Sequence, residues 1–120
     1  MRLADAQTPR IDSLNNVLNK RLQEKNDDTV TILILQDLCN EWSEIDVQKA
    51  FEYADQALKM SENKGLKWQS ASYIHFGRFY RNQDMKERAL DYFLKALKIS
   101  EELKDSVACA YAYNDVGSVY

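Results

Sequence analysis

The sequence contains few residues that interrupt a helix. Among 120 residues there are one proline and three glycines, and these residue types are the usual markers of turns and bends. No segment shows the alternation of apolar and polar residues that is typical of a half-buried strand. With 45% apolar and 29% charged residues, the composition is that of a globular chain of one domain's length. The sequence therefore predicts an all-α fold.

Residues suited to catalysis or metal binding are also scarce. The two cysteines, Cys39 and Cys109, form no CxxC cluster, so both are expected to be small packing residues. His75 is the only histidine, which excludes a multi-histidine metal site within these residues. No acid stands at a helical spacing from it, and no glycine-rich phosphate loop is present. We therefore expect no catalytic residue, metal or cofactor, and we predict that the chain is not an enzyme.

Two further classes of partner lack their usual signals. The formal net charge is −3, and lysines alternate with acids along the chain, so there is no basic surface for nucleic acid. A membrane-spanning helix needs about 20 apolar residues, and the apolar run from Val30 to Leu35 is much shorter. We therefore expect neither nucleic-acid binding nor direct membrane insertion by this segment.

The most informative positive feature is a phrase that occurs twice, with its two glycines 40 residues apart. The copies are Tyr73-x-x-Phe76-Gly77-x-x-Tyr80 and Tyr113-x-x-Val116-Gly117-x-x-Tyr120. Residues at i, i+3, i+4 and i+7 form one stripe of a helix. Because glycine costs about 1 kcal/mol relative to alanine inside a helix, Gly77 predicts the close approach of a second helix.

The expected second helix follows directly and carries Ala89-x-x-x-Phe93-x-x-Ala96. Its alanines allow the two backbones to come close, and Phe93 fills the gap between them. Asp84 is expected to cap this helix, with Glu87 as its capping-box partner. Together the two stripes predict a helical hairpin.

A less regular copy of this hairpin precedes it. At a separation of 39 residues, Ala50, Tyr53 and Ala57 match Ala89, Tyr92 and Ala96. The stripe of the helix before them is Leu35, Leu38, Cys39 and Trp42. Asp46 is expected to cap the second helix of this earlier hairpin, and Gly65 to end it in a left-handed conformation.

On these phrases the chain resembles tetratricopeptide-repeat proteins. The resemblance covers residues 30–120 and implies antiparallel helical hairpins stacked as an α-solenoid, which binds other proteins. The chain departs from the family in two ways: Glu101 stands where a closing proline is common, and the period is nearer 40 than about 34 residues. Elongated phrases such as the one from Ala96 to Asp105 resemble repeats that precede bacterial signalling modules, including sensor histidine kinases and nucleotide cyclases.

The resemblance also implies a domain organisation. Residues 1–8 are expected to be disordered, 9–25 to form a capping helix, 29–65 a degenerate hairpin, 66–104 a full hairpin, and 105–120 the first helix of a truncated third unit. The apolar face expected for the capping helix is Ile11, Leu14, Val17, Leu18 and Leu22. The parent protein is expected to continue beyond Tyr120. Val116, Val119 and Tyr120 would then lack their cover, which favours self-association through this helix or an exposed apolar patch.

A binding groove can be assigned by the same resemblance, because the first helices of stacked hairpins line the concave side. The groove residues expected are Gln36, Asn40, Ile74, His75, Arg78, Arg81, Asn82, Tyr111, Asn114 and Asp115, with Ser43, Ala71 and Ser118 beside them. Arg78 and Arg81 would suit an acidic side chain or a peptide carboxylate. The alternative is that both are solvated or pair with neighbouring acids. A clamp for chaperone C-termini is not expected, since of its five ligands only Asn40 is present.

We therefore expect a protein-interaction or sensory scaffold module of a larger bacterial signalling protein. The first alternative is a free-standing adaptor, and the second is a small-ligand-binding or enzymatic helical domain with a pocket at His75. Ala4-Asp5-Ala6 resembles the end of a secretory signal, although no apolar region precedes it. Signalling proteins of the kind that the chain resembles often carry such repeats outside the inner membrane, so a periplasmic location is expected, with a cytoplasmic one as the alternative.

Overall fold

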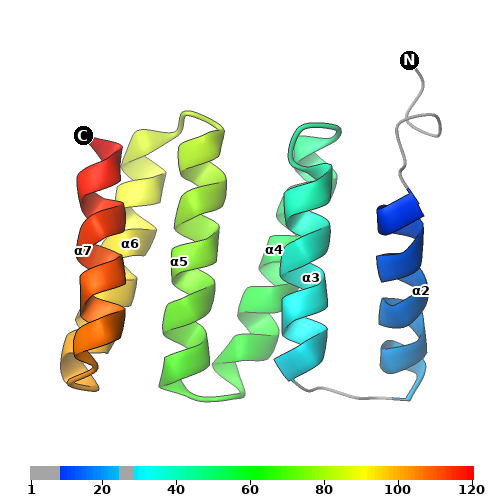
Figure 1. Ribbon diagram of the computed structural model, residues 1–120, viewed down its shortest axis with the longest axis horizontal. Helices are drawn as coiled ribbons and strands as arrows, with labels where there is room; N and C mark the ends of the chain where they lie inside the picture. The colour runs from blue at the N-terminus through cyan, green and yellow to red at the C-terminus, as the bar shows by residue number, and fades with distance from the viewer. Residues whose placement is uncertain (1–8, 25–28) are drawn as a thin grey trace. The chain divides into compact units, whose positions relative to one another are not determined.

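The computed structural model describes residues 9–24 and 29–120, which are helical except for short connections (Figure 1). The helices are α2 (Pro9–Gln23), α3 (Thr29–Trp42), α4 (Val47–Glu62), α5 (Leu66–Asn82), α6 (Lys86–Glu102) and α7 (Ser106–Val119). No strand occurs in these ranges, so the predicted all-α fold is confirmed. The predictions for residues 1–8, including Ala4-Asp5-Ala6, lie outside the described residues. None of the helices in the described ranges is long and apolar enough to cross a membrane.

The chain divides into two compact units, Met1–Met60 and Ser61–Tyr120. In the first unit α2 packs mainly on α3, and the Arg10 guanidinium donates a hydrogen bond to Glu41 Oε1 at 2.7 Å. Ile11 and Leu18 of α2 are buried, but Val17 and Leu22 are exposed. The wider apolar face expected for this helix is therefore wrong at those two positions, because a helix that packs mainly on one other helix buries only a narrow stripe.

The stripe expected on α3 forms the core of the first unit. Leu35, Leu38, Cys39 and Trp42 are all at most 2% exposed, as predicted. Burial raises the pKa of the Cys39 thiol from 9.0 to about 12, so this side chain stays protonated and apolar. At the start of α4, the backbone N–H of Lys49 donates to Asp46 Oδ1 at 3.3 Å. The prediction that Asp46 caps this helix is confirmed.

In the second unit, α5 and α6 run antiparallel, side by side (Figure 1). The close approach expected at Gly77 is confirmed. A Cβ atom at this position would lie 2.5 Å from Cε1 of Phe93, which is far inside the van der Waals contact distance. Ala89, Phe93 and Ala96 are completely buried against this side of α5. The absence of a side chain at Gly77 is what lets the Phe93 ring lie on the backbone of α5.

An aromatic cluster extends the same interface along α5. The ring of Tyr92 on α6 stacks on Phe76 with 4.9 Å between centroids and on Tyr80 with 5.6 Å. The Lys95 ammonium lies 4.9 Å from the centroid of the same tyrosine. Aromatic pairs of this kind contribute about 0.5 to 1.5 kcal/mol beyond their buried area, so the hairpin is held by more than its alanine seam.

The turn between α5 and α6 differs from the expected capping box. Met85, not Asp84, is the residue that precedes α6, and no side chain caps the helix there. Asp84 instead adopts a left-handed conformation with φ of 61°. The N–H of Met85 donates to the carbonyl of Tyr80, and that of Asp84 to the carbonyl of Arg81. This is the Schellman pattern that ends a helix, so Asp84 closes α5 rather than opening α6.

Gly65 has the positive φ that was expected, at 109°, but the residue stands directly before α5 rather than at the end of α4. At the turn between α6 and α7, Lys104 is left-handed, as Asp84 is in the turn between α5 and α6. Asp105 then caps α7, because its side chain accepts a hydrogen bond from the backbone N–H of Ala108 at 3.0 Å. The left-handed Lys104 and the cap at Asp105 together fix where α7 begins relative to α6.

The face that α7 turns toward its neighbours is not entirely the one expected. Ala112, Asp115 and Val119 are buried, because α7 packs on α6 and touches α5 along this side. The expectation that Val119 lacks cover is therefore wrong. Tyr120, by contrast, is 90% exposed, and nothing lies within 4 Å of where a Cβ would stand at Gly117. The two glycines of the repeated phrase thus have opposite surroundings.

Candidate functional site

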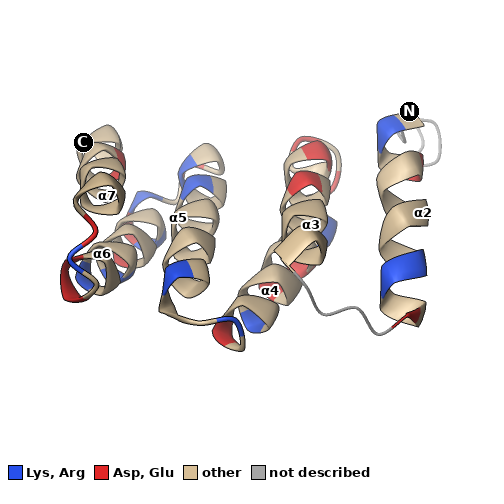
Figure 2. Ribbon diagram, turned by 60° about the horizontal axis from the view of Figure 1, so that its bottom comes forward, with Lys and Arg blue, Asp and Glu red and all other residues tan. Residues whose placement is uncertain are grey.

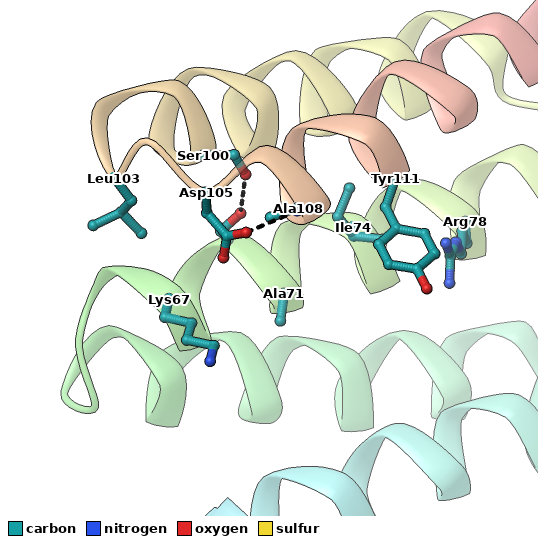
Figure 3. A pocket seen from close by; sticks show the side chains of 10 residues that line it. Lys67, Ala71, Ile74, Arg78, Ser100, Leu103, Asp105, Ala108 and Tyr111 are labelled. Carbon is teal, nitrogen blue, oxygen red and sulfur yellow. Dashed lines mark hydrogen bonds between the residues drawn. The ribbon is translucent and has the colours of Figure 1, made fainter.

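The second unit contains a pocket of about 340 Å³ between α5, the end of α6 and α7 (Figure 3). The lining residues are Lys67, Ser70, Ala71, Ile74, Arg78, Ser100, Leu103, Asp105, Ala108 and Tyr111. Small-molecule and side-chain pockets in proteins commonly begin at about 300 Å³. The volume is therefore enough for one bulky side chain or a small ligand.

One stripe of α5 forms a long wall of the pocket. Lys67, Ala71, Ile74 and Arg78 follow one another at spacings of four, three and four residues, so their side chains share one face of the helix. This face is adjacent to the stripe that carries Gly77 and packs on α6. Lys67 lies at one end of the row and Arg78 at the other, with Ala71 and Ile74 between them (Figure 3). The charged groups thus stand at the two ends of an apolar middle.

The opposite wall comes from the turn after α6 and from the first two turns of α7. Leu103 and Ala108 add apolar surface, and Tyr111 brings its ring beside Arg78 (Figure 3). Asp105 also lines the pocket, and its carboxylate is oriented by the N-cap hydrogen bond to Ala108. The N–H of Lys104 donates to the carbonyl of Glu101 and that of Asp105 to the carbonyl of Ser100, which is again the Schellman pattern. Because this wall depends on where α7 starts, this turn and the cap at Asp105 position it.

Two buried serines join the helices behind the pocket. The hydroxyls of Ser70 on α5 and Ser100 on α6 lie 3.2 Å apart, and both donate to the carbonyl of Ala96, at 3.2 and 2.9 Å respectively. Buried polar groups that are hydrogen-bonded in this way cost little. These serines therefore leave the apolar side chains as the main contact surface for a ligand.

Beside the pocket, two arginines of α5 share one carboxylate of α7. Arg78 donates to Asp115 through Nε at 3.2 Å and through Nη2 at 2.9 Å, which is a two-pronged pair. Arg81 Nη1 lies 3.5 Å from the same carboxylate and donates to Ser118 Oγ at 2.7 Å. The Asp115 side chain is 9% exposed, whereas that of Arg78 is 46% exposed. For these arginines the sequence left open either recognition of an acidic ligand or solvation and pairing with a neighbouring acid. In the structure both arginines pair with Asp115.

The structure distributes the other predicted groove residues over several places. Ile74, Arg78 and Tyr111 line the pocket, and Arg81 and Asp115 form the adjacent ion-pair cluster. His75 is half-buried on α5 and does not line the pocket. Asn82 at the end of α5 and Asn114 on α7 are exposed and do not line the pocket. Gln36 and Asn40 lie on α3 of the first unit, Gln36 half-buried and Asn40 exposed.

Six lining residues were not predicted: Lys67, Ser70, Ser100, Leu103, Asp105 and Ala108. Lys67 is one helical turn before Ala71 on the same face, so extending the groove stripe toward the start of α5 would have found it. Leu103 and Asp105 belong to the turn between α6 and α7. The path of this turn depends on the left-handed conformation of Lys104 and on the cap at Asp105, and helical periodicity gives no signal for residues in such a turn. Among residues 9–24 and 29–120, no group of three or more His, Cys, Asp or Glu side chains is arranged to hold a metal ion.

Comparison of the sequence with models of known protein families and with curated proteins found no match.

Proposed function

We propose that the chain is a protein-interaction module that holds an apolar side chain of a peptide or protein in the pocket between α5 and α7. The observation that carries this function is the pocket itself: its size, its apolar middle and its polar ends. Interaction pockets for side chains combine an apolar interior with a few polar groups that fix orientation. Lys67, Asp105 and Tyr111 supply such groups at the rim.

We assign recognition to the apolar middle rather than to the arginines. Asp115 already neutralises part of the charge of Arg78 and Arg81, and a two-pronged pair leaves the Arg78 guanidinium with fewer donors for an incoming carboxylate. Binding an acidic group there would mean competing with a nearly buried carboxylate. Filling the pocket with an aliphatic side chain needs no such exchange and removes apolar surface from water, at about 25 cal/mol per Å².

We further propose that the helical hairpins belong to a tetratricopeptide-type solenoid. The repeated phrase around Gly77 and Gly117 and the contact of Gly77 with Phe93 support this arrangement. In our proposal the module is part of a larger bacterial signalling protein in the periplasm, with a free-standing adaptor and a cytoplasmic location as the alternatives. It recognises a partner and carries out no catalysis.

The pocket can be tested by filling it. Peptides selected from a random library on the immobilised protein are expected to bind with their affinity dependent on one apolar residue. The Ala71→Trp variant, which places an indole in the pocket, is expected to lower that affinity tenfold or more, equivalent to about 1.4 kcal/mol. Isothermal titration calorimetry measures the change.

The matched control is Leu94→Trp, at an exposed position of α6 that does not line the pocket. This variant is expected to bind the selected peptide as the unmodified chain does. Equal affinities for the unmodified chain and Ala71→Trp would place the binding surface elsewhere. Failure to select any peptide that binds the folded protein would contradict the proposed function itself.

A further inference from the structure

The two cations that line the pocket between α5 and α7 differ in how their charges are used. At one end of the pocket, the Arg78 guanidinium forms a two-pronged pair with Asp115. At the other end Lys67 is exposed, and none of the residues that the structure describes forms an ion pair with it. Lys67 is therefore the lining cation whose charge is available to a ligand.

Asp105 is the one acid among the described residues that line the pocket, and the fold offsets part of its charge. The carboxylate accepts a hydrogen bond from the backbone N–H of Ala108 at 3.0 Å, at the start of α7. A helix N-terminus carries about half a positive charge, which lies next to this carboxylate. The Lys67 side chain points away from Asp105 (Figure 3). Asp105 therefore does not neutralise Lys67.

The charge around the pocket is opposite in sign to that of the whole chain. Three cations lie in or beside the pocket: Lys67, Arg78 and Arg81. The acids there are Asp105 and Asp115, so one positive charge is left over, whereas the formal net charge of the chain is −3. Lys67 also lies in the first turn of α5, which contains no acid, and the helix dipole opposes a cation there. Both effects favour a negative group of the partner beside Lys67.

The pocket lies on the opposite side of α7 from the stripe that carries Gly117. Ala108, which lines the pocket, and Gly117 are nine residues apart, which is about two and a half helical turns. In the hairpin of α5 and α6, α6 covers the stripe of Gly77 and leaves Ala71, on the pocket side of α5, exposed. A helix that covered the stripe of Gly117 in the same way would leave the pocket open.

We propose that the partner carries an acidic side chain close to the apolar side chain that fills the pocket, and that Lys67 binds this acid. The inference rests on the proposed function of the pocket. Lys67 lies one helical turn before Ala71 and two turns before Ile74, so the lysine and the apolar middle are separated by about 6 to 10 Å along α5. Neighbouring residues of an extended peptide are about 3.3 Å apart. The acid is therefore expected two or three residues from the apolar anchor.

Peptide selection on three immobilised proteins tests the charge preference. Peptides selected on the unmodified chain are expected to be enriched in Asp or Glu near their apolar anchor. Those selected on Lys67→Glu are expected to lose this enrichment and to gain Lys or Arg at the same positions. Lys98→Glu, at an exposed position of α6 that does not line the pocket, is the matched control and is expected to select the same acidic peptides as the unmodified chain. Circular dichroism establishes that both variants remain helical.

Calorimetry with one selected peptide, synthesised with both ends blocked, measures the contact itself. Lys67→Gln is expected to weaken binding about two- to fivefold, which is the range of an exposed ion pair. Replacing the acid of the peptide by its amide is expected to weaken binding to the unmodified chain by the same factor. Because the two changes remove one interaction, the combination is expected to cost no more than either change alone. A salt concentration of about 0.5 M is expected to remove most of the difference.

The outcomes separate this inference from the proposed function. Selected peptides whose apolar anchor is sensitive to Ala71→Trp, but which show no acidic preference, would overturn the role of Lys67 and leave the pocket as the recognition site. An unchanged acidic preference on Lys67→Glu would overturn it as well. Affinity that is lost when the C-terminus of the peptide is blocked would assign the charge to the chain terminus and contradict an acidic side chain. If no peptide bound the folded protein, the proposed function would fail and this inference with it.

Discussion

Replacing Gly77 with leucine is expected to lower the melting temperature of the second unit by roughly 10 °C. A Cβ at this position would lie 2.5 Å from Phe93 Cε1, and the ring is completely buried, so it has no free space to move into. Overpacking of this kind costs about 1 to 3 kcal/mol, and we expect the upper part of that range. Thermal unfolding followed by circular dichroism measures the change, with Gly77→Ala as a milder variant that keeps the fold.

The matched control for this prediction is Gly117→Leu. The position has open space around it, so a side chain there meets no resistance, and the loss of glycine from the last turn of α7 slightly favours the helix. A second control is Gly77→Ala combined with Phe93→Ala, in which the ring is absent and the cost of the added methyl should fall. Equal losses of stability at Gly77 and Gly117 would remove the close-approach explanation.

Neutralising Asp115 is expected to be the second most costly change. Asp115→Asn keeps the shape of the side chain but leaves Arg78 and Arg81 without a counter-charge in a place where the acid is 9% exposed. Breaking a charge-assisted pair with one buried member costs about 1 to 3 kcal/mol. The arginines are partly exposed, which keeps the cost below that of a fully buried pair. Urea unfolding monitored at Tyr and Trp fluorescence gives the difference in free energy.

Asp91→Asn is the control for the loss of charge, since Asp91 is exposed on α6. Substitutions at exposed positions usually change stability by less than about 0.5 kcal/mol. If Asp115→Asn and Asp91→Asn were equally mild, the contact between α5 and α7 would depend on packing alone. The ion pairs would then be a consequence of the fold rather than a cause of it.

The sequence allowed some features of the fold to be predicted because their physical cause is local. A glycine inside an apolar helical stripe has few explanations other than close packing, and the structure places Phe93 on Gly77. The buried stripe of Leu35, Leu38, Cys39 and Trp42 was predictable for the same reason: periodicity identifies which face is covered. Asp46 was recognisable as a helix cap because its side chain accepts a hydrogen bond from a backbone N–H only three residues later, that of Lys49.

Features that depend on competing local choices or on tertiary packing were not predictable. Aspartate is favourable both as an N-cap and in a left-handed turn. At Asp84 the hydrogen bonds that close α5 stabilise the left-handed conformation, so the residue does not cap α6. The rotation of α7 is set by its contacts with α5 and α6, among them the Arg78–Asp115 pair between residues 37 positions apart. That rotation buries Val119 and leaves Tyr120 exposed. The pocket follows from the same packing, so only part of its α5 side, and Tyr111 of α7, could be predicted.

The most direct test of the proposed function is to map a bound peptide on the isotope-labelled protein by nuclear magnetic resonance. With a peptide selected as described above, the largest amide shift changes are expected at Ala71, Ile74, Ala108 and Tyr111, around the pocket between α5 and α7. Their saturation should follow the affinity measured by calorimetry. Shift changes confined to α3, to the exposed end of α7 around Tyr120 or to the charged surface of α6 would contradict the assignment of this pocket as the recognition site.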